Sequence, residues 1–184
     1  MRRLSALLLA LAVAPGAAAA PAHWTSAAPS SLDWTAKWQG TPVKGSFPDF
    51  TVKASFDPQA PAGGTVMVGI DATAVRSASG DVTHAIHGPQ WFDTGHHPRA
   101  SFHGRFSGKP GNLHLAGTLQ LKGHHAKVQM PVKLARQGDG SVLLTGSVAL
   151  QRGDFGIGTG KWSSSSMIAP DVDVTFSVTL QKRD

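Results

Sequence analysis

Residues 148–162 decide the fold, and they read V-A-L-Q-R-G-D-F-G-I-G-T-G-K-W. They begin as a strand, because Val148 and Leu150 occupy alternate positions. Four glycines then interrupt the strand and hold Phe155 and Ile157 on a tightly turned loop, since glycine reaches positive φ without steric cost. This pattern predicts a lip at the end of a sheet or barrel. It is not a phosphate loop, because the spacing G-x-x-x-x-G-K-[ST] is absent.

The same alternation of apolar and polar residues extends over most of the chain. It predicts eight strands joined by short turns, each with one apolar and one polar face. At Pro48 the apolar row changes from odd to even positions, which predicts a bulge inside the second strand. The expected strands cover residues 32–38, 43–56, 66–72, 100–106, 113–121, 128–134, 142–150 and 172–180.

One stretch, residues 81–95, breaks the alternation. Asp81 is the expected N-cap of a short helix, and Gly88-Pro89 is expected to end it and to begin another. The chain is therefore predicted to be all-β, an eight-stranded antiparallel barrel with one short helical insertion. Sequential hairpins give antiparallel order, and closure removes the sheet edges. A two-sheet sandwich has the same local pattern and is the alternative.

The N-terminus reads as a signal peptide over residues 1–22, followed by one domain over residues 23–184. Arg2 and Arg3 precede an apolar run, residues 4–13, which is too short to span a bilayer, and small residues follow it. We expect secretion, to the periplasm in a Gram-negative cell. Loss of the leader removes two arginines and lowers the formal charge from +6 to +4. Lysine and arginine are scattered, so nucleic-acid binding is not expected. The chain has no cysteine, so its core must stabilise it without disulfides.

Several segments, in this order, resemble the YceI-like family of polyisoprenoid-binding, lipocalin-like periplasmic proteins. The D-F-G-I-G sequence at residues 154–158 is the most specific of them, and the resemblance extends over nearly all of the chain after the leader. The matching segments are residues 24–34, 43–58, 66–71, 91–102, 117–123 and 152–162.

The resemblance implies a lipocalin-like barrel that holds a lipid with an isoprenoid tail, such as a quinone precursor. It implies no catalytic residues and no cofactor other than the bound lipid, and it adds a homodimer as an expectation. Transient membrane contact is a separate expectation, because mild basicity can favour an anionic membrane surface. For any single apolar row, ordinary core is the better interpretation, but for the aromatic set a ligand-lined cavity becomes competitive. The expected cavity-lining residues are Phe50, Phe56, Val68, Ile70, Phe92, Phe102, Phe106, Leu119, Leu144, Phe155, Ile157 and Phe176.

Nine histidines suggest a second kind of function, a metal-binding or stress-responsive protein on the same barrel. His84 and His87 are three residues apart in the expected helix and are the weak candidates for metal ligands. An enzyme is the third class, but no serine stands in a G-x-S-x-G turn. Asp154 and Arg152 are expected to hydrogen-bond the amides of their own loop and so to hold the lip in shape.

Overall fold

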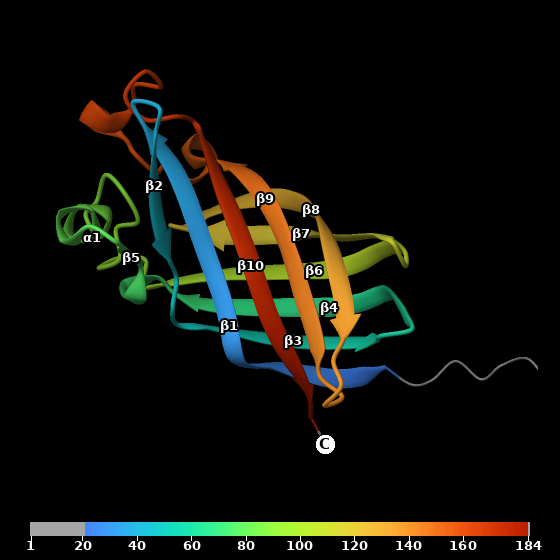
Figure 1. Cartoon of the computed structure of the whole chain (residues 1–184). Helices are drawn as coiled ribbons and strands as arrows, with labels where there is room; N and C mark the ends of the chain where they lie inside the picture. The colour runs from blue at the N-terminus through green and yellow to red at the C-terminus, as the bar shows by residue number, and fades with distance from the viewer. Residues whose placement is uncertain (1–20, 184) are drawn as a thin grey trace, which may run out of the picture.

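The computed structural model describes residues 21–183, and the predicted signal peptide lies outside this range except for its last two residues. Ten strands form one antiparallel sheet (Figure 1). They are β1 (Ala22–Trp38), β2 (Thr41–Ser46), β3 (Phe50–Asp57), β4 (Ala60–Asp71), β5 (Arg76–Ser77), β6 (Arg99–Lys109), β7 (Asn112–Leu121), β8 (His124–Arg136), β9 (Val142–Gln151) and β10 (Asp171–Lys182). Short helical segments are α1 (Gly80–Ile86), η1 (Ala72–Ala74), η2 (Arg152–Phe155) and η3 (Gly160–Trp162).

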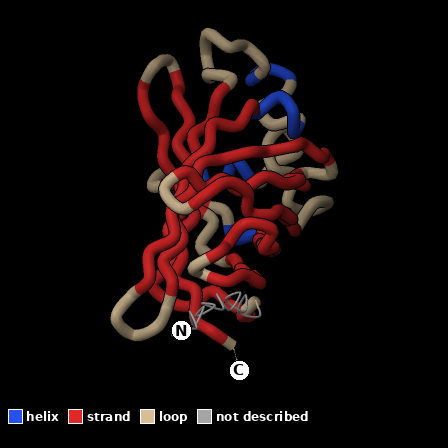
Figure 2. The backbone as a smooth tube through the Cα atoms, turned by 90° about the vertical axis from the view of Figure 1, so that its right-hand side faces the viewer, coloured by secondary structure: helices blue, strands red, loops and turns tan. Residues whose placement is uncertain are grey.

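Eight of these strands close into a barrel, as the alternation predicted. The order is β1-β3-β4-β6-β7-β8-β9-β10, and β10 pairs with β1 to complete the ring. In Figure 1, β1, β10 and β9 cross in front of the strands that follow β3, and α1 lies with β2 and β5 at one end. Figure 2, turned by 90°, shows that strands make up most of the backbone. The sandwich alternative is excluded by the closure.

The predicted second strand is divided in the structure, and β1 pairs with each part in turn. It pairs with β3 over residues 22–25 and with β2 over residues 33–38. The change of parity at Pro48 is therefore a break between β2 and β3, and the predicted bulge inside one strand is wrong. The buried side chains still occupy odd positions before the break and even positions after it, as Phe47 and Val52 show.

The polar segment before Leu32 is also strand, although its sequence shows no alternation. The ladder to β10 shifts register between Ala27 and Ser30. Serine hydroxyls supply bonds at this irregularity: the Ser26 hydroxyl accepts from the Val52 amide at 2.9 Å, and the Ser30 hydroxyl accepts from the Thr179 amide at 3.1 Å. Side chains thus replace part of the ladder, which is how the strand continues through a polar stretch.

The helical insertion is shorter than predicted. Ser79, rather than Asp81, is the N-cap of α1, and its hydroxyl accepts from the Val82 amide. Turns follow Gly88, where the sequence predicted a second helix. Ile86 is buried against Phe47, whose ring makes an edge contact with Phe92 at 5.5 Å. The insertion therefore packs over one end of the barrel. Among residues 21–183, no helix is long and apolar enough to cross a bilayer.

Candidate functional site

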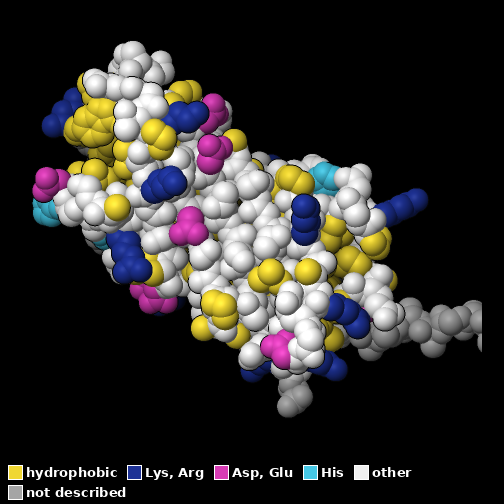
Figure 3. All heavy atoms as spheres, in the orientation of Figure 1, with side chains coloured by type: hydrophobic (Ala, Val, Ile, Leu, Met, Phe, Trp, Pro, Cys, Tyr) yellow, Lys and Arg dark blue, Asp and Glu magenta, His cyan; other side chains and the backbone are white. Residues whose placement is uncertain are grey.

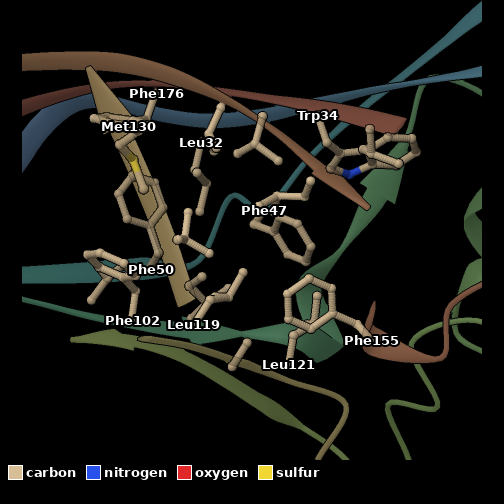
Figure 4. Close-up of a pocket in the computed structure, with 18 of the residues that line it drawn as sticks. Leu32, Trp34, Phe47, Phe50, Phe102, Leu119, Leu121, Met130, Phe155 and Phe176 are labelled. Carbon is tan, nitrogen blue, oxygen red and sulfur yellow. The ribbon is translucent and has the colours of Figure 1, made fainter. Parts of the chain in front are cut away.

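The inward-facing side chains enclose an apolar cavity of about 170 Å³ in the barrel (Figure 4). Of its 26 lining residues, 25 are apolar and the remaining one is Arg152. The lining comes from all eight barrel strands and from the loops at the end that carries the insertion. Such a surface can bind an apolar chain by excluding water, and it offers few groups for polar recognition.

Ten of the twelve residues expected to line the cavity do so. They are Phe50, Val68, Ile70, Phe92, Phe102, Leu119, Leu144, Phe155, Ile157 and Phe176. Contact of these residues with a ligand stays a prediction. Other lining residues were not among those expected, and they include Leu32, Trp34, Phe47 and Met130, which Figure 4 shows around the same space. These four belong to the same alternating rows, so the signal was present in the sequence.

Phe56 and Phe106 lie outside the cavity lining, at the opposite end of the barrel. Their rings meet at 5.2 Å, and Trp24 stacks on Phe56 at 5.4 Å. The Trp24 indole N–H donates to the Phe56 carbonyl oxygen at 3.1 Å, so its one polar group is satisfied. All three side chains are buried. This aromatic cluster therefore fills the end of the barrel that lies away from the insertion.

Arg152 organises the lip at the end that carries the insertion, and its side chain is buried. Its five N–H groups donate to backbone carbonyl oxygens, with Nη1 bonding Gly158 at 2.8 Å and Ile157 at 3.0 Å. The other three accepting carbonyls belong to Ser163, Ile168 and Ala169. Burial lowers the pKa of this guanidinium from its ordinary value. The arginine therefore ties η2 to the segment that leads into β10.

The predicted roles of Arg152 and Asp154 need correction. Arginine has no acceptor atom, so it bonds the loop's carbonyls rather than its amides. Asp154 is exposed, and within residues 21–183 no salt bridge joins it to Arg152. The lip is thus held by a cation surrounded by carbonyl dipoles, not by a pair of charged side chains.

Lys122, in the turn between β7 and β8, adds a second connection. Its ammonium donates to the carbonyls of Pro89 at 2.8 Å and Gly156 at 2.7 Å. Desolvation by burial lowers its pKa. The Gln90 carbonyl also accepts the amide of Gly158 at 2.7 Å. The insertion, the β7–β8 turn and the lip therefore form one hydrogen-bonded lid.

We expect Gly158→Ala to destabilise this lid. Gly158 has φ +72°, and an added Cβ would lie 2.5 Å from Arg152 Nη1. The backbone strain alone costs about 1–3 kcal/mol, and displacement of the guanidinium adds to it. Gly63→Ala is the matched control, because Gly63 has φ +83° but nothing within 4 Å of the added carbon. Urea unfolding should show a larger loss for Gly158→Ala; equal losses would contradict the clash.

The candidate metal ligands lie apart from the cavity. His84 is exposed on α1, and His87 Nδ1 is 3.0 Å from the Thr94 hydroxyl. Among residues 21–183, no group of three or more His, Cys, Asp or Glu side chains is arranged to hold a metal ion. The geometry therefore gives no support to the metal-binding alternative.

The fold and the cavity define the class: a closed, lipocalin-like eight-stranded barrel with an apolar interior. The model of the YceI-like domain matches residues 24–180, and the chain belongs to this family. A search of curated proteins found no match.

Solved structures share the architecture. BcnA of Burkholderia cenocepacia is 28% identical, with a TM-score of 0.77 over 82% of this chain and 95% of that one. The YCEI protein of Campylobacter jejuni is 18% identical, with a TM-score of 0.68 over 77% and 85%. A polyisoprenoid binding domain from Saccharophagus degradans, implicated in plant cell wall breakdown, is 15% identical, with a TM-score of 0.66 over 89% and 99%. The last two likenesses show the fold alone.

Proposed function

We propose that this protein binds an isoprenoid-type lipid, such as a polyisoprenoid or a quinone precursor, and carries it in the periplasm without catalysing a reaction. The observation that carries the proposal is the cavity, whose lining is apolar at 25 of 26 positions. The name of the Saccharophagus degradans domain supports the choice of an isoprenoid tail. The leader-like sequence at residues 1–22 supports export.

The energetics favour reversible binding. Each buried CH₂ group contributes about 0.8 kcal/mol relative to water. A tail that leaves a membrane gains far less, because it was already in hydrocarbon. The protein therefore shields the tail in transit and releases it readily to a second membrane, which is the behaviour expected of a carrier.

Native mass spectrometry of protein purified from its own cell tests this proposal. The expected spectrum shows an added mass, and lipid extraction should return a molecule with an isoprenoid tail. Delipidated protein should regain a mass on incubation with a long-chain prenol. Protein that stays empty in both experiments would refute lipid binding. The same spectra report the mass of the assembly, which tests the further proposal that the protein forms a homodimer.

Membrane contact is proposed at the end of the barrel that carries the lid. The rings of Trp38 and Trp162 meet at 5.6 Å, Trp91 lies 5.8 Å from Trp162, and the ammonium of Lys161 lies 4.9 Å from the Trp162 ring. Figure 3 shows hydrophobic side chains gathered at this end beside lysine and arginine. Tryptophan favours the interface between water and lipid, and lysine favours anionic head groups.

We expect the double variant Trp38→Ser/Trp162→Ser to lose most of its sedimentation with vesicles that contain anionic phospholipid. Trp38 is 39% exposed, so the change removes apolar surface that the fold does not bury. Met67→Ser is the control, since Met67 is 48% exposed on β4, away from the lid. Equal sedimentation of the double variant and the control would place membrane contact elsewhere.

A further inference from the structure

The barrel wall is incompletely paired between β8 and β9. Their ladder covers five residue pairs, from Arg136–Val142 to Val132–Gly146. Beyond it, residues 124–131 of β8 pair with β7 on their other side, and residues 147–151 of β9 pair with β10. The two strands separate above this fork, as can be followed in Figure 1. We call the space between these two unpaired segments the β8–β9 slot.

The sequence explains why pairing stops at the fork. In the same register, the next pair would place Pro131 opposite Ser147. Proline has no N–H to give to a ladder and is confined to strand edges. Since Pro131 pairs with His114 on its β7 side, the β9 side of β8 is the edge. Pro131 therefore sets the position at which the slot begins. The slot lies within the two strands and is not a frayed chain end.

A second cavity of about 220 Å³ lies in the slot, on the outer side of the wall. It shares four lining residues, Val128, Val148, Leu150 and Phe155, with the apolar cavity inside. The side chains of these four residues therefore form the partition between the two spaces. The β1–β3 ladder is also short, with four pairs, but farther along β1 pairs with β2, and the Ser26 hydroxyl bonds the Val52 amide.

The inner cavity must enlarge before a long tail can enter. Its volume of about 170 Å³ is close to that of an engineered apolar cavity, about 150 Å³, that holds one benzene molecule. Widening the ring at a paired seam would break ladder hydrogen bonds. Beyond the Val132–Gly146 pair, β8 and β9 form no further ladder pairs, so these segments can part without breaking any.

We propose that the β8–β9 slot is the lateral entrance of the cavity, where the barrel parts to admit the lipid tail and where the polar head group remains. The proposal rests on the proposed lipid binding. The outer rim carries Lys127, Gln129, Gln151 and Asp154, which amount to one cation, one anion and two amides. Charges that balance in this way, beside unpaired backbone amides and carbonyls, fit a hydrogen-bonding head group of low net charge rather than a diphosphate.

A cross-link across the slot tests the proposal in the intact barrel. The outward residues Gln129 and Ala149 face each other across it in the continued register, so both are changed to cysteine and joined with a short bis-maleimide. Lys133 and Thr145, an adjacent pair on the same two strands below the fork, provide the matched control. The native chain has no cysteine, so each reaction is confined to the introduced pair.

The measurement is transfer of a fluorescent prenol between donor vesicles and delipidated protein, with native mass spectrometry of protein loaded before cross-linking. We expect the Gln129→Cys/Ala149→Cys cross-link to slow transfer by about tenfold or more, since closing the slot raises the barrier to entry. Lipid loaded beforehand should be retained, and the control cross-link should leave the rate unchanged. Equal rates for both cross-linked proteins, with lipid still bound, would overturn the slot proposal alone. Absence of lipid from the unmodified protein would instead overturn lipid binding itself.

A second arm compares head groups in unmodified protein. A prenol should displace the fluorescent probe at lower concentration than the prenyl diphosphate of the same chain length. The opposite order would overturn the assignment of a head group of low charge to the slot.

Discussion

Replacing Arg152 with methionine should lower the free energy of unfolding by about 3–5 kcal/mol, because five backbone carbonyls of the lip and of the segment that leads into β10 lose their donor together. A buried acceptor left without a partner costs about 1–3 kcal/mol. The total is smaller than the sum of five such costs, since an opened lip lets water reach several of the carbonyls. Methionine keeps much of the side-chain volume, so the loss reports hydrogen bonds rather than a cavity. Urea unfolding monitored by tryptophan fluorescence measures it.

Two further variants separate the hydrogen bonds from the charge. Arg152→Lys keeps a cation but has three donors on one atom in place of a planar group with five, so an intermediate loss is expected. Arg105→Met removes an exposed arginine whose one long bond, at 3.4 Å, reaches the Gly63 carbonyl, and it should change stability by less than about 0.5 kcal/mol. A lysine variant as stable as the native protein would show that charge alone holds the lip.

The barrel could be predicted from sequence because it depends on a local property. Alternation places side chains on one face whatever the strand pairs with, so the rows led by Leu113 or Val172 identified their strands without knowledge of neighbours. The first half of β1 could not be found in this way. Its register shift and its serine-mediated bonds depend on Val52 and Thr179, which are far away in sequence.

The apolar period of a strand predicts which side chains point into the barrel, but it does not predict where they lie along the barrel axis. Phe56 and Phe106 point inward, as their rows predicted, yet they lie with Trp24 at the end away from the insertion and not along the cavity. Depth along the barrel axis depends on strand tilt and stagger, which a single strand does not record. For the same reason Pro131 was visible in the sequence, but its position opposite β9 at the fork was not.

Filling the cavity should abolish most lipid binding while the barrel stays folded. Val68, on β4, lines the cavity beside its ladder partner Phe102 of β6, and Val68→Trp would place an indole in a space of about 170 Å³. Exclusion of one isoprene unit, with five carbons, removes up to about 4 kcal/mol of burial relative to water. For uptake from solution we therefore expect affinity to fall by between about tenfold and a thousandfold.

Met67→Trp is the matched control, because the neighbouring residue on β4 points outward and is 48% exposed. It introduces the same side chain into the same strand without entering the cavity, so prenol binding should match that of the native protein. Thermal unfolding of the two variants distinguishes occupation of the cavity from damage to the barrel. If Val68→Trp unfolds like the control and still binds prenol with native affinity, the lipid does not occupy this cavity.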